Sequence, residues 1–288
     1  MKKIFAFILV LVLSLSLSAC IILSESDPQT PSSVIPGSNV SKATISETVL
    51  FDQSGVKITA KSLETNGFLG PEIKLLIENN SGKDLTFQCR NVSVNGYMVD
   101  PMLSVDVVNG KKANDAISFM SSELEACGIE TIADVELSFH IFTTSEWETY
   151  LDTPQIQIKT SAAETYQYTF DDSGTLAYEG HGTKIIIKGL DTNGSILGPE
   201  IIVYIENNGN QPICVQTQGV SINGYMVDAF FSPEVMPGKH AVSSITFLSS
   251  DLQNNGITKI ESVELSFHIF NNDTWDTIVD TNTVNINF

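Results

Sequence analysis

The chain has 288 residues with 15 basic and 34 acidic side chains, so its formal net charge at pH 7 is −19. A surface this acidic repels nucleic acid and gains nothing from anionic lipid, because all three carry the same sign of charge. The acidic residues are scattered along the chain rather than massed in blocks. This pattern favours a surface that keeps the protein in solution, with cation binding as the alternative.

The first twenty residues, MKKIFAFILVLVLSLSLSAC, have the order of an export signal. Two lysines precede an apolar run that is too short for a membrane-spanning helix, which needs about 20 apolar residues. The run ends in Leu-Ser-Ala-Cys at Cys20, which resembles the bacterial lipoprotein signal. The resemblance implies cleavage after residue 19, a lipid attached to Cys20, and a location on the extracytoplasmic face of the cell membrane. An ordinary secretory signal with a chance cysteine is the alternative.

Residues 20–48 are rich in Ser, Pro and Thr and show neither a strand nor a helix period. This composition predicts a flexible, lipid-anchored stalk. The rest of the chain is a tandem repeat: NGYMVD stands at 95–100 and at 223–228, and VELSFHIF stands at 135–142 and at 263–270. Each copy has the length of an ordinary domain. We therefore predict two domains with separate cores at 49–160 and 175–288, joined by a linker at 161–174.

Each repeat has the pattern of an antiparallel β-sandwich. VELSFHIF alternates apolar and polar residues with the period of a half-buried strand, and short strands recur between turn residues. Asn95-Gly96 is the pair preferred in two-residue hairpin turns. Ser122–Glu125 fits a capping box, with Gly128 placed to end one helical turn, and the second repeat has an equivalent segment. We predict an all-β protein of two tandem immunoglobulin-like antiparallel sandwich domains, each with one short helical turn.

The Asn-Gly hairpin and the Gly-Lys turns at 109–112 and 237–239 resemble those of immunoglobulin-like modules in surface lipoproteins of Gram-positive bacteria. The resemblance covers about 49–160 and 175–288. Most of those families are uncharacterised. The resemblance implies a fold and a location on the cell surface, and it brings no catalytic residue with it.

Six aromatic or methionine side chains are candidates for binding a protein or glycan partner on the cell surface. Four of them follow the Asn-Gly turns, where we expect the hairpin mainly to set strand register and where a partner contact is the alternative. Two tryptophans follow the VELSFHIF strands, where we expect them to lie in the core or to cover a sheet edge, with an exposed sugar-stacking platform as the alternative. The six are Tyr97, Met98, Tyr225, Met226, Trp147 and Trp275.

Three cysteines follow Cys20. Cys89 and Cys127 occur in the first repeat, and both positions have lost cysteine in the second, which is the pattern of a disulfide. Such a bond would close a loop of about 38 residues and stabilise the fold by about 3 kcal/mol if it is unstrained. The sequence cannot place the two sulfurs within bonding range, so free thiols are the alternative. We expect Cys214 to be a small buried apolar residue.

The sequence offers no motif for catalysis, a cofactor or zinc. It lacks the paired-histidine and Cys-x-x-Cys spacings of zinc sites and the Gly-rich loops that bind phosphates. The segments Asn271–Asp276 and Asp171-Asp172 contain carboxylates but lack the alternation and the glycine of a calcium loop. We therefore expect neither a metal nor a cofactor, and we expect the protein not to be an enzyme.

Two functional hypotheses follow. The first is a lipid-anchored extracytoplasmic protein that acts as a non-catalytic binding, adhesion or structural module. The second is an accessory subunit of an envelope enzyme or transport complex, or a hydrolase whose site lies between the two domains. An inter-domain site would use residues that differ between the repeats, namely His181, Glu179, His240 and Asp171.

Overall fold

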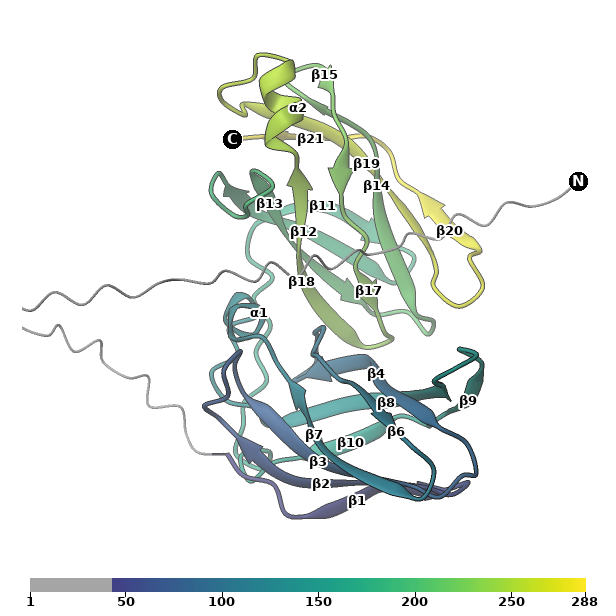
Figure 1. The fold of residues 1–288 in the computed structure, drawn as a ribbon. Coiled ribbons are helices and arrows are strands. Elements are labelled where there is room, and N and C mark those ends of the chain that lie inside the picture. Colours follow the sequence, from purple (N-terminus) through teal and green to yellow (C-terminus); the bar gives the residue numbers. More distant parts are fainter. Residues whose placement is uncertain (1–42) are drawn as a thin grey trace, which may run out of the picture. The chain divides into compact units, whose positions relative to one another are not determined.

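The computed structural model describes residues 43–288, and the predicted signal peptide, Cys20 and most of the predicted stalk lie outside these residues. Two helices and twenty-one strands make up this part of the chain. In it, no helix is long and apolar enough to cross a membrane. The predicted all-β fold is therefore confirmed, with antiparallel sheets and one short helix in each repeat (Figure 1).

The first repeat contains ten strands and one helix. They are β1 (Thr48–Gln53), β2 (Val56–Glu64), β3 (Glu72–Asn79), β4 (Leu85–Val94), β5 (Tyr97–Met98), β6 (Ser104–Val107), β7 (Lys111–Ser118), α1 (Ser121–Ala126), β8 (Asp134–Thr143), β9 (Thr149–Asp152) and β10 (Ile156–Lys159). Strands β1, β2, β3 and β7 form one sheet, and β4, β5, β6, β8, β9 and β10 belong to another. The alternating apolar residues of both sheets face one core.

The second repeat follows the same order. It contains β11 (Thr175–Gly180), β12 (Thr183–Asp191), β13 (Glu200–Asn207), β14 (Ile213–Ile222), β15 (Tyr225–Met226), β16 (Ala229–Phe230), β17 (Glu234–Val235), β18 (Lys239–Phe247), α2 (Ser249–Asn254), β19 (Ser262–Asn271), β20 (Thr277–Asp280) and β21 (Val284–Asn287). Its core is a second cluster of buried side chains, in which Phe247, Leu265 and Phe267 are fully enclosed.

One parallel pairing joins the two repeats. Strand β5 of the first repeat pairs with β18 of the second, with Tyr97 opposite His240. This pairing makes a single eleven-stranded sheet out of one sheet from each repeat. The described residues, 43–288, accordingly lie in one compact unit, while the apolar side chains remain in two clusters.

The hairpin turns form as predicted. Asn95 and Gly96 both have positive φ, at 50° and 86°, and Asn223 and Gly224 repeat the pattern at 51° and 84°. The asparagine side chain does more than permit this turn. The Oδ1 atom of Asn95 accepts the backbone N–H groups of Ala133 and Asp134, and its Nδ2 atom donates to the Thr131 carbonyl. The turn is thereby fastened to the start of β8.

The predicted capping box is wrong. The N-cap of α1 is Met120, which makes no side-chain hydrogen bond to the helix. The carboxylate of Glu123 instead accepts the backbone N–H of Asp100. The predicted C-terminal glycine is confirmed, since Gly128 has φ of 68° and the N–H groups of Gly128 and Ile129 close a Schellman motif.

The folded part begins before the predicted boundary at residue 49. Ala43 is buried, and the backbone N–H of Thr44 donates to the hydroxyl of Ser161. The predicted linker is also not a free segment, because the side chain of Phe170 packs against the first core and the hydroxyl of Tyr168 donates to the Asp134 carboxylate. The C-terminal end of the predicted stalk and the residues Tyr168 and Phe170 of the predicted linker therefore belong to the packed structure.

Candidate functional site

Each repeat presents one tryptophan on a tight turn after its long central strand. Trp147 has φ of 60° and Trp275 has φ of 65°, values in the left-handed region that bulky residues rarely adopt. The backbone N–H of Trp147 donates to the Thr143 carbonyl at 2.9 Å, and that of Trp275 donates to the Asn271 carbonyl at 2.9 Å. Each turn thus holds its tryptophan in a backbone conformation that costs energy.

Both indoles stack on a buried phenylalanine and leave their other face to solvent. Trp147 lies over Phe142 with ring centroids 5.5 Å apart and planes 18° apart, and Trp275 lies over Phe270 at 5.5 Å and 17°. The tryptophans are 75% and 73% exposed, whereas each phenylalanine is 4% exposed. Of the two placements expected, the one within the core is wrong, and both residues have the exposure of the alternative. We call each Trp–Phe pair a tryptophan platform.

A histidine and a carboxylate lie next to each platform. The ring of His140 lies 5.2 Å from that of Phe142, and its Nδ1 atom lies 2.5 Å from a carboxylate oxygen of Asp152. His268 and Asp280 make the same contact at 2.6 Å in the second repeat. The row of Trp, Phe, His and Asp is therefore duplicated in identity and in geometry, which is a signal that comparing the two repeats could have revealed.

The two Asn-Gly hairpins differ in exposure although their sequences are identical. Tyr97 is 4% exposed, and Met98 packs against the core of the second repeat. Tyr225 and Met226 are 51% and 67% exposed. Of the four hairpin residues predicted as candidate partner contacts, the first pair lies in the contact between the repeats and only the second pair is open to solvent.

An aromatic cluster surrounds the buried hairpin. The ring of Phe170 stacks on that of His240 with centroids 3.6 Å apart, and Tyr97 lies 5.3 Å from Phe170 and 5.9 Å from His240. The Nδ1 atom of His240 is 2.6 Å from the hydroxyl of Tyr204. Burial lowers the pKa of His240 and raises that of Tyr204, because the cluster disfavours charge on either ring.

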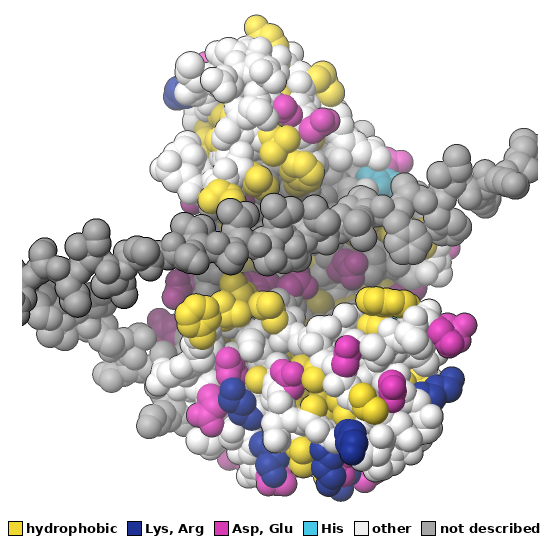
Figure 2. All heavy atoms as spheres, viewed as in Figure 1, with side chains coloured by type: hydrophobic (Ala, Val, Ile, Leu, Met, Phe, Trp, Pro, Cys, Tyr) yellow, Lys and Arg dark blue, Asp and Glu magenta, His cyan; other side chains and the backbone are white. Residues whose placement is uncertain are grey.

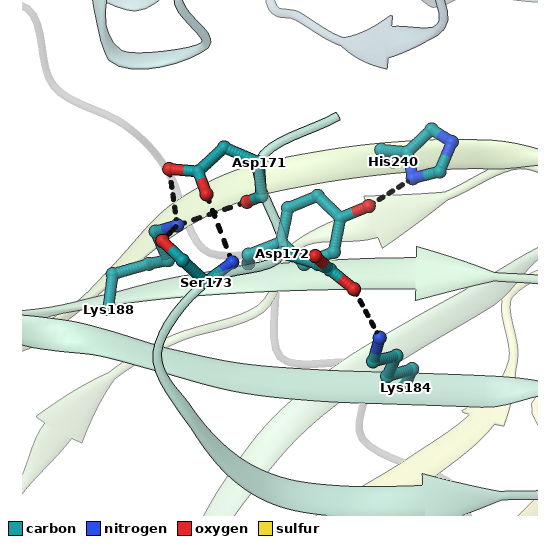
Figure 3. A network of polar contacts seen from close by, with 7 residues as sticks. Asp171, Asp172, Ser173, Lys184, Lys188 and His240 are labelled. Carbon is teal, nitrogen blue, oxygen red and sulfur yellow. Dashed lines mark hydrogen bonds and ion pairs between the residues drawn. The ribbon is translucent and has the colours of Figure 1, made fainter. Parts of the chain in front are cut away.

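Two carboxylates beside this cluster are paired with lysines. Asp171 and Asp172 make ion pairs with Lys188 and Lys184, at 2.7 Å and 2.6 Å (Figure 3). Hydrogen bonds from Lys188 and from Ser173 hold the pKa of Asp171 well below its usual range. Both acids therefore stay ionised near neutral pH, and they fix the segment that carries Phe170.

The four residues named for an inter-domain active site have separate partners. His240 bonds Tyr204, Asp171 bonds Lys188 and Ser173, and His181 lies on the turn between β11 and β12 with its Nδ1 atom 2.7 Å from the Tyr178 hydroxyl. Glu179 is exposed in β11. Within residues 43–288, no hydrogen bond or ion pair joins any two of the four.

The predicted disulfide is absent, since Cys89, Cys127 and Cys214 are all free thiols in the part of the chain described. Cys89 lies in β4 with its sulfur 4.0 Å from the Pro101 carbonyl oxygen. Cys127 caps α1, and its sulfur is directed to the backbone of Val242 in the second repeat. Burial raises the pKa of Cys89 to about 11 and that of Cys127 to about 12, so neither is a reactive thiolate.

A shallow groove of about 850 Å³ lies between the repeats. Residues of both repeats line it, and they include the acidic side chains Asp100, Glu123 and Glu234. Over residues 43–288, no cluster of three or more His, Cys, Asp or Glu side chains could hold a metal ion. In Figure 2 the acidic side chains are scattered over both repeats of the visible face, and the Lys and Arg side chains are concentrated over the first repeat.

Comparisons with known proteins leave the family open. No protein-family model matches the chain, and no curated protein matches it. The solved structures that resemble it include the YadV chaperone, at 11% identity and a TM-score of 0.24 over 75% of this chain and 92% of the chaperone chain. Another is a protein of unknown function from Porphyromonas gingivalis W83, at 13% identity and a TM-score of 0.20 over 76% and 91% of the two chains. TM-scores this low support no functional argument.

Proposed function

We propose that this chain is a non-catalytic binding protein, held on the extracytoplasmic face of the cell membrane by a lipid on Cys20, whose tryptophan platforms bind a positively charged group of a protein partner. The observation that carries the proposal is the duplicated pair of exposed indoles, each held at positive φ over a buried phenylalanine. A fold that maintains this costly arrangement twice favours a role for the exposed face.

The charge around the platforms favours a cationic ligand. Glu146 and Glu148 flank Trp147, and Asp273 and Asp276 lie beside Trp275 in the sequence, so the acidic character is kept while the residues change. A cation over an exposed indole contributes about 0.5–1 kcal/mol, and up to about 2 kcal/mol when the contact is desolvated. Two such sites on one chain would increase the affinity for a partner with several cationic groups.

The competing hypothesis has weaker support. An accessory subunit or a hydrolase with an inter-domain site would need His181, Glu179, His240 and Asp171 to act together, and each of these residues has its own separate surroundings. The resemblance to immunoglobulin-like modules of surface lipoproteins favours the binding hypothesis, because it brings strands and turns and no catalytic group.

The platforms can be tested one at a time, because the chain contains only two tryptophans. In Trp147→Phe the remaining fluorescence reports on Trp275, and in Trp275→Phe it reports on Trp147. We expect a lysine- and arginine-rich peptide to change the fluorescence of both variants. Replacing the remaining tryptophan by Ala in either variant should weaken the binding of that peptide about threefold to thirtyfold, as measured by calorimetry.

Variants of the flanking carboxylates distinguish a cationic ligand from a glycan. The double variant Glu146→Gln, Glu148→Gln should weaken binding of the basic peptide at Trp147 and leave its binding at Trp275 unchanged. The second repeat is therefore the matched control. If a neutral oligosaccharide binds, and binds equally well to the double variant, the ligand of the platforms is a glycan and not a cationic group. If neither probe changes either tryptophan, the platforms only cover their phenylalanines, and the proposal fails.

The anchor has its own test. Replacing Cys20 by Ala should release the protein from the membrane fraction and abolish labelling by a radioactive fatty acid, since the proposed thioether needs the sulfur of Cys20. Each buried methylene of an acyl chain contributes about 0.8 kcal/mol, so loss of the chains removes the membrane affinity. Acylation that persists in this variant would contradict the proposed anchor.

A further inference from the structure

The contact between the repeats shows what the Asn-Gly hairpin binds. The backbone N–H of His240, in β18, donates to the Gly96 carbonyl at 3.0 Å. On the same side, the Nζ atom of Lys239 lies 2.7 Å from a carboxylate oxygen of Glu136, and the two side chains are only 14% and 23% exposed. The first repeat thus docks on the start of β18 through the backbone of its hairpin and through a partly buried ion pair made by Glu136 of β8.

The second repeat carries the same hairpin with nothing docked on it. Gly224, Tyr225 and Met226 are exposed, and they correspond to Gly96, Tyr97 and Met98. Glu264 corresponds to Glu136 in the identical VELSFHIF strand. It is exposed, and within residues 43–288 it has no ion-pair partner. One half of the internal contact is therefore repeated at the surface.

The other half is repeated on β7, the strand of the first repeat that corresponds to β18. Strand β7 is the last strand of its four-stranded sheet. Lys112 is opposite Glu78 of β3, as His240 is opposite Glu206 of β13, so the N–H of Lys112 points to the open side of β7 in the way that the N–H of His240 does. Lys111 corresponds to Lys239, is exposed, and has no ion-pair partner in the part of the chain described.

We infer that a second copy of this chain places its β7 edge on the exposed hairpin of the second repeat, so that copies associate head to tail. The N–H of Lys112 in one copy would donate to the Gly224 carbonyl of the next, and Lys111 would pair with Glu264. The two surfaces differ, and each copy carries one of each. Such a heterologous contact extends into chains of molecules unless its rotation closes a ring.

The contact between copies should be weaker than the contact within the chain. The internal hairpin also packs on Phe170, His240 and Tyr204. The first repeat has Ala43, Lys112 and Leu76 at the corresponding positions, which cannot form the aromatic stack. The preserved parts are the backbone bond, the ion pair and an apolar contact of Tyr225 and Met226, so the association should be concentration-dependent and salt-sensitive.

The test reverses the two charges in separate samples of the full chain, each carrying Cys20→Ala so that no acyl chain contributes to association. By sedimentation velocity, the wild-type protein should show concentration-dependent association within a series that reaches about 1 mM, where a Kd of that size half-populates a complex. Glu264→Lys alone and Lys111→Glu alone should each remain monomeric, because every contact would then bring together two like charges. An equimolar mixture of the two variants should associate again, since each contact between unlike copies restores an opposite pair.

A control pair makes the same change in net charge at other exposed positions. Glu179→Lys, Lys159→Glu and their mixture should all associate as the wild-type protein does. The inference is overturned if the wild-type protein stays monomeric over the whole series. It is also overturned if the mixture of Glu264→Lys and Lys111→Glu fails to recover association, because the ion pair would then have no part in it. These outcomes do not depend on the platforms or on the lipid.

Discussion

The hairpins at 95–98 and 223–226 have the same sequence and the same backbone turn, yet one is buried and the other is open. Tyr97 is 4% exposed and Tyr225 is 51% exposed. The asparagine of each turn bonds the segment before the next long strand in the same way. The local sequence therefore determines the local fold, while the burial of the hairpin depends on residues far away in the chain.

Those distant residues are the positions at which the two repeats have diverged. The second repeat has Tyr204 and His240 where the first has Leu76 and Lys112, and Phe170 precedes β11 where Ala43 precedes β1. The three aromatic rings create a surface on which Tyr97 packs. The difference shows that the docking hairpin is present in both repeats, whereas the aromatic docking surface is present in one repeat only.

The largest expected effect comes from replacing the tyrosine of each hairpin by alanine. Tyr97→Ala should lower the free energy of unfolding by about 3 kcal/mol, because it removes a buried ring between the two cores. Tyr225→Ala, its matched control, should change it by less than about 0.5 kcal/mol, since the ring is largely in solvent. Urea unfolding followed by circular dichroism measures both. Equal losses in the two variants would mean that the repeats do not differ in how they bury this hairpin.

The asparagines test the part of the comparison that should be equal. Asn95→Ala should cost about 2 kcal/mol, because it leaves two N–H groups and one carbonyl without their partner and because alanine tolerates a positive φ less well than asparagine. Asn223→Ala should cost somewhat less, since its surroundings are more exposed.

Glycine separates the two contributions in the same experiment. Asn95→Gly keeps the positive φ and removes the hydrogen bonds, so it should recover only the part of the loss that comes from backbone strain. Full recovery by glycine would show that the hydrogen bonds to Ala133 and Asp134 do not stabilise the fold.

Local patterns in the sequence predicted much of this fold. The alternation in VELSFHIF gave β8 and β19, the Asn-Gly pairs gave both hairpin turns, and Gly128 gave the end of α1. These features succeed because each depends on the conformation of a few adjacent residues. The capping box failed because the helix begins at Ser121 with Met120 as its N-cap, so that Ser122 lies inside the helix.

The candidate site was predicted less well because exposure is a property of the whole fold. Trp147 and Trp275 were expected in the core or over a sheet edge, yet each indole lies on a left-handed turn and is largely exposed over a phenylalanine. The pattern of loss at Cys89 and Cys127 suggested a bond, yet the two sulfurs meet different neighbours. The sequence signal for the contact between repeats was that Leu76 and Lys112 of the first repeat correspond to Tyr204 and His240 of the second. The structure is needed to show that these positions lie together beside the hairpin of the first repeat.

The smallest effect concerns His240, which replaces the Lys112 of the first repeat. Burial lowers its pKa, with the nearby Glu206 raising it and Lys239 lowering it further, while in the unfolded chain an imidazole titrates near about 6.5. The unfolded state therefore binds the proton first as the pH falls. The contribution is fully present above about pH 6.5, and it is lost as the pH falls from there through the lowered pKa of the folded state.

Comparing the wild-type protein with His240→Gln isolates this contribution, because the variant removes no other ionisable group and glutamine can still bond the Tyr204 hydroxyl. Between about pH 7.5 and 5.5 the wild-type protein should lose more unfolding free energy than the variant, by at most about 1.4 kcal/mol, because this window reaches about one pH unit below the pKa of the unfolded state. Identical pH slopes would mean that His240 is as accessible to protons as it is in the unfolded chain. The aromatic cluster would then not exclude water from the docked hairpin, and the burial of Tyr97 would have to rest on the Lys239–Glu136 pair and the backbone bond at Gly96.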